Sequence, residues 1–336
     1  MSLALIPYSS PPSIEKIAFD AFQFCKRNPE VYSRCLKNLN EKTERAVKAS
    51  FSFLSDSFNE KNFCITITGS DARYEKESKH SPVELIIVCE GEIDLPSYQN
   101  IQNFILSHPN IFDARIEVKN LENPHASTTY SQGKKPKIIP SRALDAIFVA
   151  GNPQIFALYK KHLATSLRSL KNKDFKKFSR DFLSDAKRKL LQTLQGKEKK
   201  YCDFTKGVLF YNKNLHIMTT KYILLRVVQY TIAQQISQKI RSGSWENPEE
   251  LLTALPNGTV DRLIFLKERE LISLKEGKLQ EIAWAYNFAL MLHNITQWQS
   301  CSMGGAPGQI QIDPEDLQKM CAIILNFSEN ASIWER

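Results

Sequence analysis

The sequence predicts an α+β fold, in which a mixed β-sheet core is flanked by an N-terminal helical segment and a C-terminal helical bundle domain. Short β-branched and apolar runs with strand character cluster between residues 63 and 150. Apolar residues at helical spacing fill the chain before and after that interval. The 336 residues, 42% of them hydrophobic, are enough for more than one buried core. We therefore expect a helical segment at 1–60, an α/β domain at 61–152 and a helical domain that binds a substrate or partner at 153–336.

Residues 14–59 predict three helices before the first strand. In each helix the apolar residues recur at helical spacing, and Pro29 suits the first turn of the second one. The apolar positions are Ile17, Phe22 and Cys25 in the first helix, Val31, Cys35 and Leu39 in the second, and Val47, Phe51, Leu54 and Phe58 in the third.

The α/β domain is expected to contain strands separated by one helix and one polar loop. The predicted elements, in order, are strands at 63–68 and 83–88, a helix at 97–107, a strand at 114–118, a loop at 124–136 and a strand at 143–150.

The turn after the first strand is the most informative part of the sequence for function. Gly69 can adopt a positive φ that lets phosphate oxygens approach the backbone, and the Ser70 hydroxyl and the following amides can bind them. Glu84 and Asp145 place carboxylates in apolar runs that we expect to form neighbouring strands. Hard cations take oxygen ligands and bridge phosphate oxygens, so this set predicts a site for a divalent ion that holds a triphosphate. Taken singly, such a carboxylate is more often a strand-end charge that reaches solvent.

The chain after residue 152 predicts a succession of helices. We expect a turn-rich hinge at 206–215 and a glycine-rich loop at 300–309, and Asp313 should cap a final helix that begins at Pro314. His293 on an apolar face is interpreted as a core histidine. The predicted helices are 155–170, 222–240, 249–255, 260–271, 279–299 and 314–327.

The net charge of +9 is unevenly distributed. Residues 160–239 carry +14, whereas residues 240–336 carry −5. A basic face of this kind attracts an acidic protein partner or nucleic acid, and it is also what solvated lysine-rich helices produce. No stretch approaches the length of a membrane span and the N-terminus lacks the pattern of a secretory signal, so we expect a cytoplasmic protein without a membrane span. Seven scattered cysteines predict reduced thiols rather than a zinc site.

Several of these segments resemble one family. Gly69-Ser70-x-Ala72-Arg73-x-Glu75, followed by an acidic strand, is similar to the signature of DNA polymerase β-like nucleotidyltransferases. Within it, the resemblance is to bacterial members often attached to CBS domains, relatives of glutamine synthetase adenylyltransferase and PII uridylyltransferase. It extends over residues 50–327. The further segments that carry it are Leu144 to Asn152, Phe204 to Gly207, Arg262 to Gln297 and Ile312 to Leu317.

The resemblance implies a nucleotide site with magnesium. In the family, two aspartates on one strand and a third on the next bind two Mg²⁺ ions during nucleotidyl transfer. Here the metal-binding and catalytic positions fall on Glu84 and Asp145, and Pro82 stands where the first aspartate is expected. Asp71, Glu75 and Glu117 are nearby acids that could substitute. The nucleotide-binding positions that the resemblance implies, for ATP or another nucleoside triphosphate, are Gly69, Ser70, Arg73, Glu75 and Lys206.

The sequence is compatible with three functions. Because a proline cannot ligate metal, the first is a nucleotide-binding or scaffold pseudoenzyme with a regulatory or partner-binding role, its basic region 160–239 contacting an acidic protein. The second is a weakly active enzyme that transfers NMP from NTP to a protein or small-molecule acceptor. The third is a nucleic-acid-binding protein that uses the same basic region.

Overall fold

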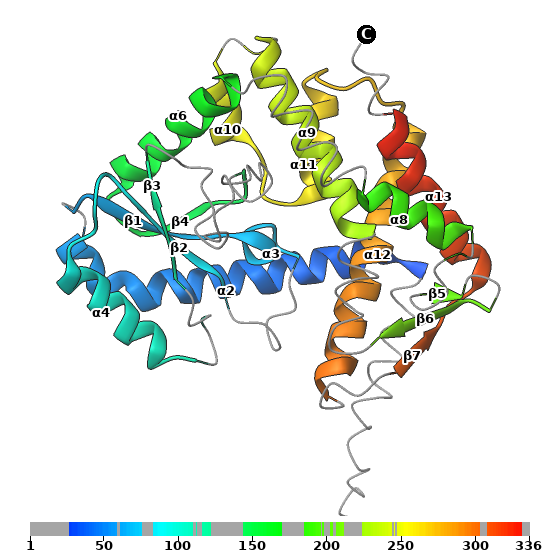
Figure 1. Ribbon diagram of the computed structural model, residues 1–336, viewed down its shortest axis with the longest axis horizontal. Coiled ribbons are helices and arrows are strands. Elements are labelled where there is room, and N and C mark those ends of the chain that lie inside the picture. Colours follow the sequence, from blue (N-terminus) through cyan, green and yellow to red (C-terminus); the bar gives the residue numbers. More distant parts are fainter. Residues whose placement is uncertain are drawn as a thin grey trace, which may run out of the picture.

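The computed structural model in Figure 1 is an α+β protein, as the sequence predicts. A mixed sheet with its covering helices forms one end, and helices with a small second sheet form the other. The structure describes residues 27–58, 61–75, 83–109, 112, 116–121, 144–169, 185–195, 197, 202–203, 206–211, 224–243, 245, 247–302 and 308–330.

The mixed sheet has the strand order β3-β2-β1-β4. β1 is antiparallel to both β2 and β4, whereas β2 and β3 are parallel. β2 and β4 begin later than predicted, so Glu84 and Asp145 precede their strands instead of lying within them. The strands are β1 (Phe63–Ile67), β2 (Leu85–Cys89), β3 (Glu117–Asn120) and β4 (Ile147–Gly151).

Helices cover both faces of this sheet. α2 (Pro29–Phe58) and α4 (Leu95–Leu106) pack on the face that carries Phe63 and Ile65. α6 (Pro153–Ser169) covers the opposite face, where Tyr159 packs against Cys64. Side chains alternate between the faces of a strand, so a sheet covered on both sides needs nearly continuous apolar runs. This is why every residue of β1 and β2 is buried.

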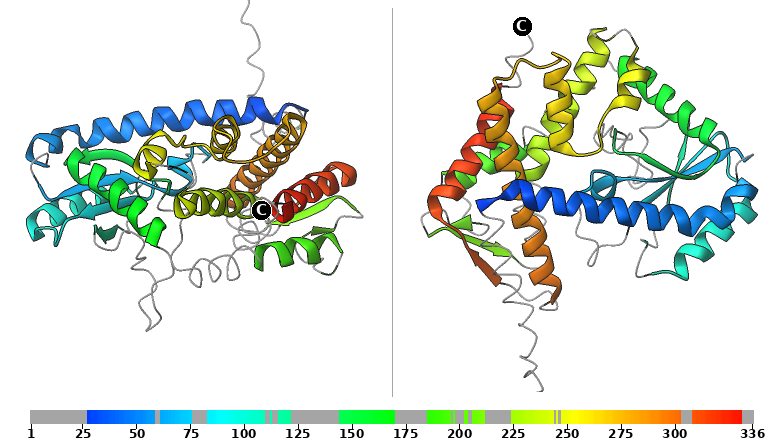
Figure 2. Two further views of the ribbon diagram at one scale, coloured as in Figure 1. Left: turned by 90° about the horizontal axis from the view of Figure 1, so that it is seen from above. Right: turned by 180° about the vertical axis from the view of Figure 1, so that it is seen from behind.

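α2 replaces two of the predicted helices. The second and third predicted helices form one continuous helix, because no glycine or proline interrupts the chain between Leu39 and Val47. Pro29 opens it, as expected. The first predicted helix lies outside the described residues. Figures 1 and 2 show that α2 runs alongside the sheet and continues beside the helical end of the molecule.

α6 also joins the two ends. Its first half packs Ile155 and Tyr159 onto the sheet, and its second half contributes Leu163 and Leu167 to the core of the helical domain. The other helices of that domain are α8 (Asp185–Leu194), α9 (Arg226–Ser242), α10 (Pro248–Ala254), α11 (Thr259–Glu268), α12 (Glu276–Ser302) and α13 (Pro314–Asn330).

Two predicted loops contain strands. β6 (Val208–Tyr211) occupies the predicted hinge, and β7 (Gly308–Gln311) begins inside the predicted glycine-rich loop. With β5 (Cys202–Asp203) they form an antiparallel sheet in the order β5-β6-β7. β6 and β7 pair across about a hundred residues, and spacing within either segment does not reveal this partner.

The C-terminal cap forms as predicted. The backbone N–H of Glu315 donates to Asp313 Oδ1 at 2.9 Å, at the start of α13. His293 is buried on α12, in agreement with its interpretation as a core histidine. Among the described residues, no helix is both long enough and apolar enough to cross a membrane.

Gly207 provides a test of how the small sheet meets α13. Its φ is +62°, and a Cβ atom at this position would overlap the carbonyl oxygen of Ile312. We expect Gly207→Ala to lower the free energy of unfolding by about 3 kcal/mol or more, because the left-handed backbone costs about 1–2 kcal/mol and the crowded methyl adds a similar amount. The shift in the urea midpoint measures this loss.

Gly243→Ala is the matched control. Its φ is +71°, but a Cβ atom there would meet nothing within 4 Å, so only the backbone cost of about 1–2 kcal/mol should appear. Equal losses for the two variants would contradict the close contact between Gly207 and Ile312.

Candidate functional site

The Gly69-Ser70 turn has the conformation that the sequence predicts. Gly69 follows β1 and opens the short helix α3 (Gly69–Ala72) with a φ of +73°. A Cβ atom on Gly69 would lie 2.9 Å from Oε2 of Glu84, so the Glu84 carboxylate stands directly against this turn. The Thr68 N–H donates to the Glu84 carbonyl oxygen at 3.1 Å and holds the two segments in register. The structure therefore brings Gly69, Ser70 and Glu84 together.

Asp145 has a different environment. Its side chain is only 1% exposed, and each carboxylate oxygen faces a guanidinium group. Arg73 Nη1 donates to Oδ2, and Arg262 Nη1 donates to Oδ1 at 2.6 Å. Arg262 is fixed by two further hydrogen bonds, from Nε to the Pro256 carbonyl oxygen and from Nη2 to that of Leu144. Asp145 is therefore bound by two arginines with little exposed side-chain surface, 11% for Arg73 and 6% for Arg262, one from each end of the molecule.

Glu75 extends this arrangement into the helical domain. Arg73 Nε donates to Glu75 Oε2 at 2.8 Å, so Arg73 binds both buried carboxylates. Glu75 Oε1 accepts from the Thr259 backbone N–H at 3.2 Å, at the first residue of α11. We call Arg73, Glu75, Asp145 and Arg262 the Asp145 network. Its charges balance, and its two acids come from the α/β domain.

Side chains of α9 and α12 complete the network. Gln229 Nε2 donates to Glu75 Oε2 at 3.1 Å and to the Tyr286 hydroxyl at 2.8 Å. The Tyr286 hydroxyl donates to Thr259 Oγ1 at 3.1 Å, and Asn294 Nδ2 donates to the Glu75 carbonyl oxygen at 3.2 Å. The network thus fixes the end of α3 to three helices of the other domain.

The charged states of the network follow from this geometry. Burial works to lower the pKa of Arg73, but the carboxylates of Asp145 and Glu75 more than offset it and raise that pKa. Burial raises the pKa of Tyr286 well above its ordinary value, and the Glu75 charge raises it further. Arg73 therefore stays a cation, and the Tyr286 hydroxyl stays protonated and able to donate.

Glu84 and Asp145 are not on neighbouring strands, which corrects the sequence-based expectation. β1 lies between β2 and β4, and adjacent strands are about 4.8 Å apart, so the two chain segments are separated by roughly twice that distance. A metal ion at Asp145 would also have to displace a guanidinium from each oxygen that it bound. As arranged, this pair does not fit a shared Mg²⁺ ion. Among the described residues, no group of three or more histidine, cysteine or acidic side chains is placed to hold a metal.

Glu117 is the acid that the topology places beside Glu84. β2 and β3 pair with Ile86 opposite Glu117, and Glu84 lies two residues before Ile86. Val83 and Leu85 point into the core beneath α2 and α4, so alternation directs Glu84 to the opposite face, which Ile86 and Glu117 share. Glu117 Oε1 is buried and has no hydrogen-bond partner in the described part of the chain. The sequence presents Glu117 only as one of several nearby acids, because strand order cannot be derived from spacing.

Lys206 is remote from the other predicted residues. It lies in the turn between β5 and β6, where its side chain is 76% exposed and its ammonium is 3.9 Å from the Asp203 carboxylate. Figure 1 shows this small sheet on the far side of the helical domain from α3. The structure thus does not bring Lys206 to the Gly69-Ser70 turn.

Much of the predicted basic region, including residues 170–184, lies outside the described residues. Within the described part, Lys187 donates to the Ser328 carbonyl oxygen on α13, and Arg188 is exposed. Lys187 therefore links α8 to α13 through a hydrogen bond, in addition to contributing positive charge.

The chain was compared with models of known protein families and with curated proteins, and neither comparison finds a match.

Asp145→Asn tests the network. We expect it to lower the free energy of unfolding by about 3–5 kcal/mol, because it leaves two buried guanidinium groups facing a neutral amide. The exposed pair between Lys278 and Glu281, at 2.7 Å, provides the control, and Glu281→Gln should cost less than about 1 kcal/mol. Chemical unfolding curves compare the two. A loss at Asp145 no larger than that at Glu281 would show that the buried ion pairs do not stabilise the junction.

Lys160 provides a test by pH. Its ammonium donates to the Ala146 carbonyl oxygen at 3.3 Å. Burial lowers the pKa of Lys160 to about 8, the Arg262 charge lowers it further, and the Asp145 carboxylate opposes both. Between about pH 8 and the ordinary value of 10.5, the unfolded chain holds a proton that the folded protein has released. Stability attributable to this residue must therefore rise with pH across that interval.

Lys160→Met should remove this dependence. We expect the difference in unfolding free energy, wild type minus variant, to rise between about pH 8 and pH 10.5 and to be flat below it. Denaturant titrations at several pH values measure the difference. The exposed Lys161 on the same helix gives the control variant Lys161→Met, which should show no such slope. A flat difference for Lys160 as well would mean that its pKa is not lowered by folding.

Proposed function

We propose that this chain is a nucleotidyltransferase-like pseudoenzyme, which binds a nucleotide with Mg²⁺ without transferring it and has a regulatory or partner-binding role. One observation carries the proposal: both oxygens of Asp145, the residue at the family's third acidic position, are held by buried arginines. An acid in that position serves transfer only if its oxygens are free to bind a metal ion.

Transfer requires several acids that act together. The reaction develops negative charge on both the attacking and the leaving oxygen, which two metal ions stabilise when three carboxylates hold them. Here Pro82 occupies one of those positions, and Asp145 is neutralised by Arg73 and Arg262. Releasing Asp145 would leave charged groups buried without partners, which costs about 3–5 kcal/mol. Pro82 and the arginine-bound Asp145 would each slow transfer. Together they favour nucleotide binding without nucleotidyl transfer.

Nucleotide binding is supported by the Gly69-Ser70 turn. The positive φ of Gly69 and its missing Cβ let the Glu84 carboxylate stand directly against the turn. Backbone amides of such a turn can bind phosphate oxygens. Mg²⁺ in nucleotide sites is usually held by one or two carboxylates together with phosphate oxygens. Glu84 and Glu117 would provide those carboxylates, and the buried Oε1 of Glu117 is suited to such a bond. The ion would neutralise phosphate charge.

Thermal unfolding with each common nucleoside triphosphate and Mg²⁺ tests the binding. We expect at least one nucleotide to raise the melting temperature at millimolar concentration, because a ligand that binds only the folded state stabilises it. Glu84→Gln should remove most of the shift. Glu90→Gln, an exposed substitution just beyond the other end of β2, should keep it. The absence of a shift with every nucleotide would contradict the binding half of the proposal.

Transfer is tested separately with nucleotides labelled on the α-phosphate. We expect no label to become covalently attached to this protein, to lysate proteins or to small acceptors. Label that appears with the wild type and disappears with Asp145→Asn would contradict the pseudoenzyme assignment, and it would favour the weakly active transferase.

A further inference from the structure

A pocket of about 270 Å³ lies beside the Asp145 network. Its walls come from the first turns of α2, from the segment that follows α3, from the start of α11 and from α12. Gly69, Ser70 and Glu84 are not among the residues that line it. The pocket is therefore separate from the proposed nucleotide site, although Arg73 and Glu75 form part of its wall.

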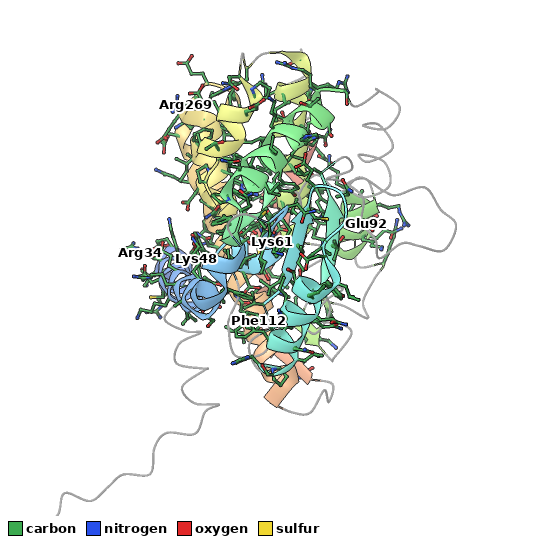
Figure 3. The ribbon with its side chains drawn as sticks, turned by 90° about the vertical axis from the view of Figure 1, so that its left-hand side faces the viewer. Arg34, Lys48, Lys61, Glu92, Phe112 and Arg269 are labelled. Carbon is green, nitrogen blue, oxygen red and sulfur yellow. The ribbon has the colours of Figure 1, made fainter. Side chains whose placement is uncertain are left out.

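The charges that line the pocket are balanced, and most are already paired. Arg73 binds Glu75 at 2.8 Å, and Lys37 on α2 binds Asp261 on α11 at 3.1 Å. Two opposite charges remain at the exposed rim, Glu30 and Arg34, one helical turn apart on α2. Neither has a hydrogen-bond or ion-pair partner within the described ranges. Figure 3 shows Arg34 projecting from the outer side of α2.

Asn287 indicates which hydrogen-bonding group an occupant of the pocket would need. It lies on α12, lines the pocket and is 6% exposed, and its Oδ1 atom has no hydrogen-bond partner among the residues that the structure describes. A buried acceptor without a donor costs free energy, so such atoms are rare unless a ligand or water completes them. The adjacent Tyr286 cannot do so through its hydroxyl hydrogen, which is donated to Thr259. The missing partner is an N–H or O–H group.

These features define the chemistry of the occupant. A nucleoside triphosphate would bring several negative charges to a pocket whose charges are balanced, and burying unpaired charge is unfavourable. The volume is also smaller than that of most sites for drug-sized ligands. A small zwitterion with a further hydrogen-bond donor matches both the rim charges and the buried acceptor.

We propose that this pocket binds a free amino acid. Its carboxylate would face Arg34, its ammonium group would face Glu30, and an N–H or O–H donor of its side chain would reach Asn287. The walls of the pocket come from α2, from the segment after α3, from α11 and from α12. A ligand in the pocket would therefore contact both ends of the molecule. Binding therefore stabilises the same junction that the Asp145 network holds.

A thermal-shift series with each standard amino acid tests the proposal on the full-length chain. We expect at least one amino acid with a polar side-chain donor to raise the melting temperature by about 3 °C or more at a hundredfold excess over its Kd. Alanine and valine, which have no such donor, should produce smaller shifts. No shift with any amino acid would overturn the proposal.

Variants at the rim assign the site. Arg34→Ala and Glu30→Ala change exposed side chains, so the fold should persist while the amino-acid shift falls by at least half. Arg45→Ala is the matched control, since Arg45 is exposed on the same helix roughly 16 Å further along and does not line the pocket. A shift that survives Arg34→Ala, or is equally reduced by Arg45→Ala, would place the ligand elsewhere and overturn the proposal.

Asn287→Leu tests the buried acceptor. It should abolish the preference for amino acids with a side-chain donor over alanine and valine, and the melting temperature without ligand shows whether the variant is folded. An intact preference in the folded variant would contradict the role of Asn287. Glu84→Gln should leave the amino-acid shift unchanged, so the outcome is independent of nucleotide binding.

Discussion

The carboxylate of Asp145, held between Arg73 and Arg262, is the interaction on which the arrangement of the two ends depends. Arg73 follows α3 in the α/β domain, whereas Arg262 comes from α11 in the helical domain. Asp145 and Arg262 are buried and Arg73 is nearly so, so removing Asp145 would leave Arg262 without a carboxylate partner and Arg73 with only Glu75. Glu75 also joins the two ends, because it accepts hydrogen bonds from Thr259 on α11 and Gln229 on α9.

This stabilisation and the pseudoenzyme assignment that we propose rest on the same interaction. A carboxylate can balance the charge of arginines or that of a metal ion, and here both of its oxygens face arginines. The acids that stand on the same face, Glu84 and Glu117, lie across β1 from Asp145. In the proposed function β1 thus lies between the arginine-bound Asp145 and the acid pair that would hold the nucleotide's metal ion. The proposed amino-acid pocket is lined by Arg73 and Glu75 of the Asp145 network but not by Glu84 or Glu117.

Two helices, α2 and α6, contact both the sheet and the helical end of the molecule. The first turns of α2 line the pocket and its later turns pack along the sheet. α6 divides its apolar residues between the sheet and the helical core. A ligand that contacts these elements acts on both ends of the molecule at once. A relative movement of the two ends would require the Asp145 network to break, so a ligand bound in the pocket would favour the arrangement described here.

The sequence by itself determined the features that depend on neighbouring residues. The fold class, the positive φ of Gly69 and the cap at Asp313 follow from local spacing and from the stereochemistry of single residues. Only the tertiary structure decided which acids have which partners. Arg262 lies 117 residues from Asp145, and the choice of Glu117 as the neighbour of Glu84 depends on strand order. Long-range pairing of charges and strands leaves no periodic signal, because it is set by how the elements pack.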